Sequence, residues 1–238
     1  MRQQNEFEPG CGGTRGQCAK RSSITEAAET LFSRNGFSAS SLDMIATAAG
    51  VSRQTIYNHY GDKENLFVAV VRDMTERVNA VLFSVIATFP DRPQSADLEP
   101  ELTAFATRLI RNCLCDRDGR ALRRMIEAEG GRYPKLFAAW RDHGPGKAWS
   151  LIGGHFARLA HEHLLSVEDP DLAARQFMAL IFADIQMMTL LGEQPSTEQI
   201  EAAAMNGVRT FIRAHDATRP VPGPSPVPAG RDATIALS

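Results

Sequence analysis

The segment Arg53–His59 concentrates side chains that can form hydrogen bonds with the edges of nucleic-acid bases. An arginine can donate two hydrogen bonds to guanine, and glutamine or asparagine can pair with adenine in a similar way. If the segment is helical, Ile56 and Tyr60 fall on one face and turn inward. The side chains left on the outside are Arg53, Gln54, Thr55, Tyr57, Asn58 and His59. This outward set matches what reading a DNA major groove requires.

The elements around this segment have the spacing of a helix-turn-helix. Apolar side chains recur every three or four residues over 24–32 and again over 42–49, which predicts two amphipathic helices ahead of it. Ser40 and Ser41 can cap the second helix, and Ser52 can cap the third. Gly50 can adopt the left-handed corner that joins them. Three short helices joined this way present the last one to DNA.

Helical periodicity continues through most of the remaining chain. A long helix is expected from Lys63 to near Pro90, and no alternation of Val, Ile and Thr predicts a sheet. The fold class is therefore all-α. Further helices are expected over 101–115, 117–130, 134–143, 146–166, 170–191 and 197–215. A polar, Gly-rich arm precedes them at 1–17, and alternate prolines predict a disordered tail at 216–238.

Composition gives no general electrostatic argument for DNA. The formal net charge is −2, and residues 1–65 hold seven Lys and Arg against seven Asp and Glu. Any attraction to phosphates must come from local placement of charge and from helix N-termini. Residues 1–13 contain no apolar run, so we expect no signal peptide. The longest candidate for a membrane span, Phe177–Leu191, is too short and is interrupted by Asp184 and Gln186. We therefore expect no membrane partner and a cytoplasmic location.

Catalytic and metal-binding motifs are missing from the sequence. It has no Gly-rich phosphate loop and no Gly-x-Ser-x-Gly turn. The four cysteines, and the histidines at 155, 161 and 163, lack the spacing of metal ligands. We expect no enzyme, no metal and no cofactor. An alternative is a helical interaction protein, or a small-molecule-binding protein that has lost DNA binding, but the polar face at 53–59 is intact.

Residues 25–37 and 41–67 resemble the DNA-binding domain of the TetR family of transcriptional regulators. The shared pattern is a first helix ending in Gly-Phe, then Ile-Ala-x-x-Ala-Gly-Val-Ser, Tyr-x-His-Tyr and Lys-Glu-x-Leu. The resemblance implies a helix-turn-helix DNA-binding domain at 18–65. It also implies an effector-binding and dimerisation domain at 66–215. The regulator would be a repressor that a small apolar effector releases from a palindromic operator.

The resemblance also implies roles for individual residues. Arg53 and Gln54 would contact bases. Lys63 would hold a phosphate, and Ser41 would cap the second helix where that helix meets the DNA backbone. Phosphates or base edges would be contacted by Thr55, Tyr57, Asn58 and His59. Asp43 departs from the family, which often has a basic or neutral residue there, and we leave it out of the predicted site because it can instead stabilise the helix N-terminus.

Residues 100–215 resemble the C-terminal domain of the AefR-like branch of this family. The partners that this implies are double-stranded operator DNA, a second copy of the chain and a small apolar effector. The expected dimer interface is the pair of apolar helices at 170–191 and 197–215, which carry more apolar side chains than one core needs. The candidate effector residues, any of which can instead be plain core, are Trp140, Trp149, His155, Phe156, Met178, Phe182 and Met187.

Overall fold

The computed structural model describes residues 15–91 and 98–217, and this part of the chain contains helices and no strand. The residues expected to form the arm before position 15 and the tail after position 217 lie outside it. The helices are α1 (Arg15–Ala39), α2 (Leu42–Ala49), α3 (Arg53–Tyr60), α4 (Lys63–Ile86), α5 (Leu98–Ile110), α6 (Arg117–Glu129), α7 (Pro134–His143), α8 (Pro145–His161), α9 (Pro170–Leu190) and α10 (Thr197–Ala214). The all-α fold expected from the sequence is confirmed.

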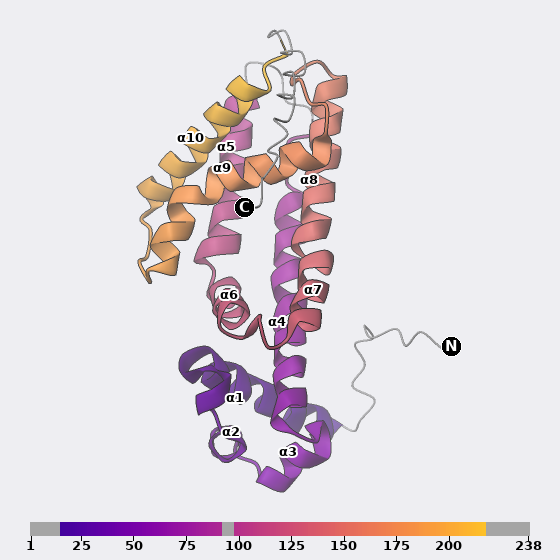
Figure 1. Cartoon of the computed structure of the whole chain (residues 1–238), viewed down its shortest axis with the longest axis vertical. Coiled ribbons are helices and arrows are strands. Elements are labelled where there is room, and N and C mark those ends of the chain that lie inside the picture. Colours follow the sequence, from indigo (N-terminus) through magenta and orange to yellow (C-terminus); the bar gives the residue numbers. More distant parts are fainter. Residues whose placement is uncertain (1–14, 92–97, 218–238) are drawn as a thin grey trace, which may run out of the picture.

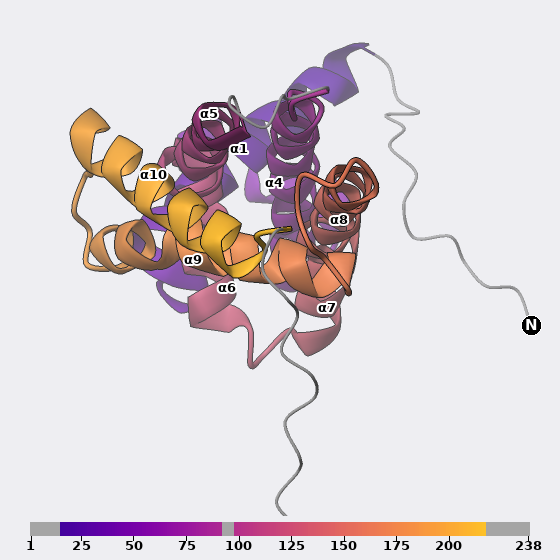
Figure 2. The same ribbon diagram turned by 90° about the horizontal axis from the view of Figure 1, so that it is seen from above.

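The helices form a small group at one end of an elongated molecule and a larger bundle above it. Figure 1 shows α1, α2 and α3 together at the lower end, with α4 rising from them into the bundle of α5–α10. Seen from above in Figure 2, α9 and α10 lie on one side of the bundle and α7 and α8 on another. The long helix α4 is therefore the continuous element that joins the two parts.

Side-chain caps and glycines define the helix-turn-helix. Ser41 Oγ accepts a hydrogen bond from the Met44 N–H at 3.2 Å, so Ser41 is the N-cap of α2. Gly50 ends α2 in the left-handed region, at φ 65°. Ser52 Oγ then accepts from the Thr55 N–H at 3.1 Å and begins α3. These short-range bonds fix the turn that separates the two helices, as predicted.

The first helix differs from its expected limits. It begins at Arg15, so the last three residues assigned to the arm are helical. Its regular geometry breaks at Gly36, where the stop was expected, with φ 79° and ψ 168°. Ser40 does not cap α2, because its side chain is buried and donates to the carbonyls of Leu31 and Gly36. The Ser40 hydroxyl therefore satisfies carbonyl groups at the irregular end of α1 instead of capping α2.

Two apolar clusters form the core. The upper one is built around five phenylalanines of the bundle whose rings meet mostly edge to face: Phe89, Phe105, Phe156, Phe177 and Phe211. The lower one contains the apolar faces of α1, α2 and α3, including Ile56, and the first half of α4. It also contains Leu122 and Met125 of α6 and Phe137 of α7. The core of the helix-turn-helix therefore extends across the boundary that we predicted at residue 65.

One predicted helix, 101–115, has a change of geometry inside it. The α-helix α5 ends at Ile110, and a π-helical segment over Arg111–Cys115 follows it directly.

Burial raises the pKa of the Cys113 thiol to about 12. No helix of the described residues is long and apolar enough to cross a membrane.

Candidate nucleic-acid interface

The helix α3 buries one residue and turns a polar face outward. Ile56 is fully buried against the lower cluster, and Tyr60 packs beside it. The side chains of Arg53, Gln54, Tyr57 and Asn58 are exposed. Thr55 and His59 are half-buried. All six predicted base and phosphate contacts on α3 therefore retain access to solvent, and Tyr57 keeps 39% of its surface.

The polar side chains of α3 are paired with one another along the helix. Arg53 Nη2 donates to Tyr57 Oη at 3.2 Å. Gln54 Nε2 donates to Asn58 Oδ1 at 3.0 Å, and the Ser52 and Thr55 hydroxyls lie 2.8 Å apart. Residues four apart on a helix are neighbours, so these pairs hold long side chains in defined positions before any ligand arrives. The face is an ordered set of donors and acceptors.

Asp43, which is not among the residues predicted from the sequence to contact DNA, belongs to this surface. From the first turn of α2, its carboxylate oxygens lie 3.0 and 3.3 Å from Arg53 Nη1. The hydrogen bond with Tyr57 and the nearby Asp43 charge both raise the pKa of Arg53. Ten residues of sequence separate the pair, so no helical spacing could have indicated it. Only the crossing of α2 and α3 brings them together.

The other two predicted contacts lie at helix starts. Ser41 is exposed at the N-terminus of α2. Lys63 is the first residue of α4, and its ammonium group lies 4.3 Å from the centre of the Phe37 ring. Its Nζ is also 3.5 Å from the Ser38 carbonyl oxygen. Lys63 is thus held against α1 by a cation–π contact while it remains partly exposed.

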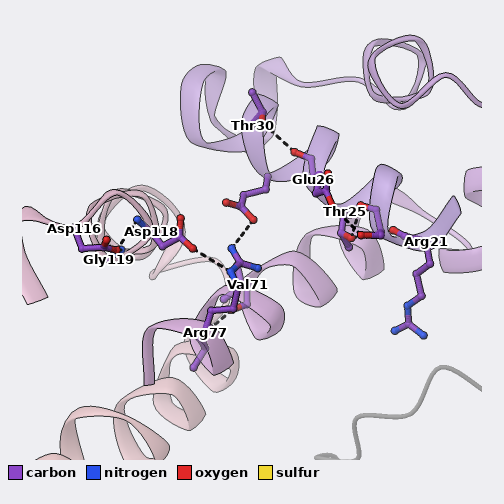
Figure 3. Close-up of polar contacts among 12 residues, drawn as sticks. Arg21, Thr25, Glu26, Thr30, Val71, Arg77, Asp116, Asp118 and Gly119 are labelled. Atoms are coloured by element: carbon purple, nitrogen blue, oxygen red, sulfur yellow. Dashed lines mark hydrogen bonds and ion pairs between the residues drawn. The ribbon is translucent and has the colours of Figure 1, made fainter. Parts of the chain in front are cut away.

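Ion pairs join the helix-turn-helix to the bundle. Arg77 of α4 contacts Glu29 of α1 at 2.7 Å and Asp118 of α6 at 3.0 Å. Figure 3 shows the Arg77 side chain directed toward Asp118. Arg132, between α6 and α7, pairs with Glu64 at 2.6 Å. Three helices therefore meet at the Arg77 guanidinium, close to the lower apolar cluster.

Five of the seven candidate effector residues gather in the upper cluster. Phe156 is fully buried, and Met178 is 9% exposed. Trp149 and Phe182 pack against the same cluster. His155 stacks on Phe89 with ring centres 4.3 Å apart, and burial lowers the pKa of His155.

The structure does not bring the other two candidates to this place. Trp140 packs against the lower cluster, and Met187 is 59% exposed on α9. None of the seven lines the surface hollow of about 700 Å³ between α5 and α10. Among the described residues, no three His, Cys, Asp or Glu side chains are grouped so that they could hold a metal ion.

The apolar residues of α9 and α10 divide between core and surface. Phe177, Ile181 and Ile185, which lie in one of the two helices expected to form the dimer interface, are buried inside the protomer because α9 packs against α8 and α10. Large apolar side chains that remain exposed on or just after α9 are Leu172, Leu180, Met187, Leu190 and Leu191. Sequence periodicity showed that both helices are amphipathic but could not tell which residues the protomer itself covers.

Two parts of the chain match known families. Residues 24–70 match the family described as bacterial regulatory proteins, tetR family. Residues 100–217 match the C-terminal domain of AefR-like transcriptional repressors. The HTH-type transcriptional repressor AcnR of Corynebacterium glutamicum is 37% identical over 62 residues, which are 26% of this chain and 33% of that protein. The chain thus matches only about a third of the length of such curated relatives.

Solved structures match over almost the whole described chain. A TetR-family regulator structure from Mesorhizobium loti is 30% identical, with a TM-score of 0.73, and the match covers 86% of this chain and all of that one. The solved structure of the Flavonoid-responsive Regulator FrrA is also 30% identical, with a TM-score of 0.63, and the match covers 84% of this chain and 98% of that one. The chain therefore belongs to the TetR family of transcriptional regulators.

Proposed function

We propose that this protein is a homodimeric repressor that binds a palindromic operator through α3 and leaves it when a small apolar molecule binds the helical bundle. The observation that carries the proposal is the outer face of α3, where Arg53, Gln54, Tyr57 and Asn58 are exposed above a buried Ile56. We place its action in the cytoplasm, where operator DNA is found, and assign it no catalytic activity.

Base recognition would rest on the N-terminal part of α3. Arg53 and Gln54 can address guanine and adenine, the bases that their donor and acceptor patterns fit. Tyr57, Thr55, Asn58 and His59 would add contacts to phosphates or base edges. Ser41 and Lys63, at the starts of α2 and α4, would fix the position of the domain on the backbone, which sets register without reading sequence.

A second copy of the chain would cover the exposed apolar side of α9. Leu172, Leu180, Met187 and Leu191 are spaced by seven, eight or four residues and so fall on one helical face. Large exposed apolar patches are uncommon on monomers and mark interaction surfaces. A two-fold axis through this face would give the two α3 helices the symmetry of a palindromic site.

The effector would bind among the five candidates that gather in the upper cluster. Their side chains are apolar or aromatic, with His155 as the polar group, which is the composition of a small-molecule site. FrrA, a similar solved structure, is described as flavonoid-responsive, which favours a small, largely apolar and aromatic compound here as well. The ligand would favour a conformation of the dimer in which the α3 helices no longer match successive major grooves.

The test of DNA binding begins with an operator selected by the purified protein from a random-sequence DNA library. Fluorescence anisotropy then compares the wild type with Arg53→Ala. Losing one good side-chain–base contact should reduce the preference for operator over random DNA by about 5- to 150-fold. Arg213→Ala removes the same charge from the exposed end of α10, remote from α3, and should change nothing. Failure of the wild type to select any sequence would refute the proposal.

The dimer is tested by sedimentation. Leu191 is 70% exposed, so Leu191→Glu puts a charge on the proposed interface without entering the core. We expect Leu191→Glu to be a monomer with a lower affinity for palindromic DNA. Leu151 of α8 is 49% exposed, and Leu151→Glu is the matched control that should remain dimeric. If both variants remained dimers, another surface would form the interface.

A further inference from the structure

We infer that Asp43 is a positioning residue for base recognition, whose carboxylate holds the Arg53 guanidinium in the orientation that reads one guanine of the operator. The inference rests on the proposed function and deepens it. Asp43 lies at the edge of a surface that must approach DNA phosphates, where a carboxylate is repelled unless it is paired.

The guanidinium of Arg53 is held at two of its three nitrogens by groups from two different helices. Asp43 of α2 accepts from Nη1, and Tyr57 of α3 accepts from Nη2 at 3.2 Å. The guanidinium carbon also lies 5.5 Å from the centre of the Tyr57 ring. A long, exposed side chain is thereby restricted on two sides before DNA is bound.

The two bonds leave Arg53 able to read a base. An arginine has five N–H donors, two of them on each terminal nitrogen. Nη1 lies 3.0 and 3.3 Å from the two Asp43 oxygens. In the inferred arrangement one Nη1 hydrogen is shared between these oxygens and one Nη2 hydrogen goes to Tyr57, so each terminal nitrogen keeps one donor. Two such donors side by side are what O6 and N7 of guanine accept. The pairing would therefore orient the Arg53 side chain and leave two of its N–H donors available for guanine.

The same pair discourages wrong complexes. If Arg53 turned toward a phosphate on unrelated DNA, it would leave the Asp43 carboxylate unpaired beside the negatively charged backbone. That repulsion lowers affinity for unrelated DNA more than affinity for the operator, so it adds to specificity. The Asp43 and Arg53 side chains are 66% and 52% exposed, and a pair this exposed contributes little to folding. Its contribution would appear when DNA covers it and excludes water.

The test measures discrimination by each variant rather than affinity alone. The operator selected by the wild-type protein is compared with versions in which each guanine is replaced in turn. We expect Asp43→Ala to lose about fivefold or more of the discrimination at one base pair, within the range of a bidentate arginine contact. Binding to random DNA should tighten, because a repelling charge is gone. Asp43→Glu should restore part of the discrimination.

Two controls separate positioning from other effects. Glu26→Gln removes one negative charge from an exposed site on α1 that contacts Ser22 and not Arg53, and it should leave discrimination unchanged. In an Arg53→Ala background, Asp43→Ala should cause no further loss at that base pair.

Each remaining outcome has a distinct meaning. Full discrimination by Asp43→Ala, or an equal loss when Arg53 is absent, would overturn the positioning role while the DNA-binding proposal stands. Failure of the wild type to bind any sequence would overturn both. Circular dichroism and thermal unfolding of Asp43→Ala verify that the fold is intact, which the exposure of the residue leads us to expect.

Discussion

Replacing Gly207 by alanine should destabilise the packing of α9 against α10, on which the proposed dimer face depends. A Cβ added at Gly207 would lie 2.9 Å from the Ile181 Cα and 2.9 Å from the Leu180 carbonyl oxygen. Both atoms belong to helix backbone, so a rotamer change cannot relieve the clash and the helices must separate. Overpacking of this kind costs about 1–3 kcal/mol, and backbone contacts place it near the upper value.

The higher helix propensity of alanine partly offsets this cost, so the expected change in stability is the overpacking cost minus the gain in helix propensity. Alanine in place of glycine favours a helix by about 1 kcal/mol. The net loss at Gly207 is then about 2 kcal/mol, a fall in Tm of about 4–8 °C for a chain of this size. Gly154 is the matched control, because it lies in α8 and a Cβ there meets nothing within 4 Å. Gly154→Ala should therefore be stabilising by up to about 1 kcal/mol.

The assay is urea unfolding of both variants at one fixed protein concentration, because the stability of a dimer depends on concentration. We expect the midpoint to fall for Gly207→Ala and to rise or stay level for Gly154→Ala. Equal urea midpoints for the two variants would refute the reasoning, because they would show that α9 and α10 are farther apart at Gly207 than in the structure.

Three further predictions concern single side chains. Because burial raises the pKa of Cys113 to about 12, a variant that keeps only this cysteine should react slowly with iodoacetamide at pH 8 until urea unfolds it, and fast labelling of the folded protein would contradict this. Burial lowers the pKa of His155 below its ordinary 6.5, so the contribution of the neutral imidazole to stability is complete above pH 6.5 and is lost as the pH falls below 6.5. His155→Gln should therefore flatten the decline in stability from pH 7 to 5. A decline as steep as that of the wild type would contradict this prediction. Arg77→Met should lower the free energy of unfolding by about 1 kcal/mol, since two partly exposed ion pairs disappear, whereas Arg141→Met loses one pair between adjacent, largely exposed residues and should have almost no effect in the same urea titration.

The parts of the fold that depend on neighbouring residues could be predicted from sequence. Ser41, Gly50 and Ser52 act within a few residues of the bonds and angles that they determine, and the structure has each in its predicted place. Prolines at the first positions of α7 and α9 likewise begin helices where expected. The π-helical segment 111–115 was not predictable, because its apolar spacing suits an ordinary helix equally well.

The parts of the site that depend on long-range packing could not be predicted. The outward face of α3 follows from helical period alone, and so does the burial of Ile56. The Asp43–Arg53 pair depends on how α2 crosses α3. The separation of Trp140 from the other effector candidates depends on which cluster α7 joins. Composition offered no signal for either.

The lower cluster limits how an effector could move the DNA-binding helices. Leu122, Met125 and Phe137 come from α6 and α7, yet they complete the core of the helix-turn-helix. Exposing three such side chains would cost about 4.5–9 kcal/mol, at about 1.5–3 kcal/mol each. Coupling between two ligand sites is commonly about 1–3 kcal/mol. Because the coupling energy is the smaller of the two, α6 and the start of α7 should move with α1–α3 as one body, and the change of shape should occur above them, where α4 enters the upper cluster.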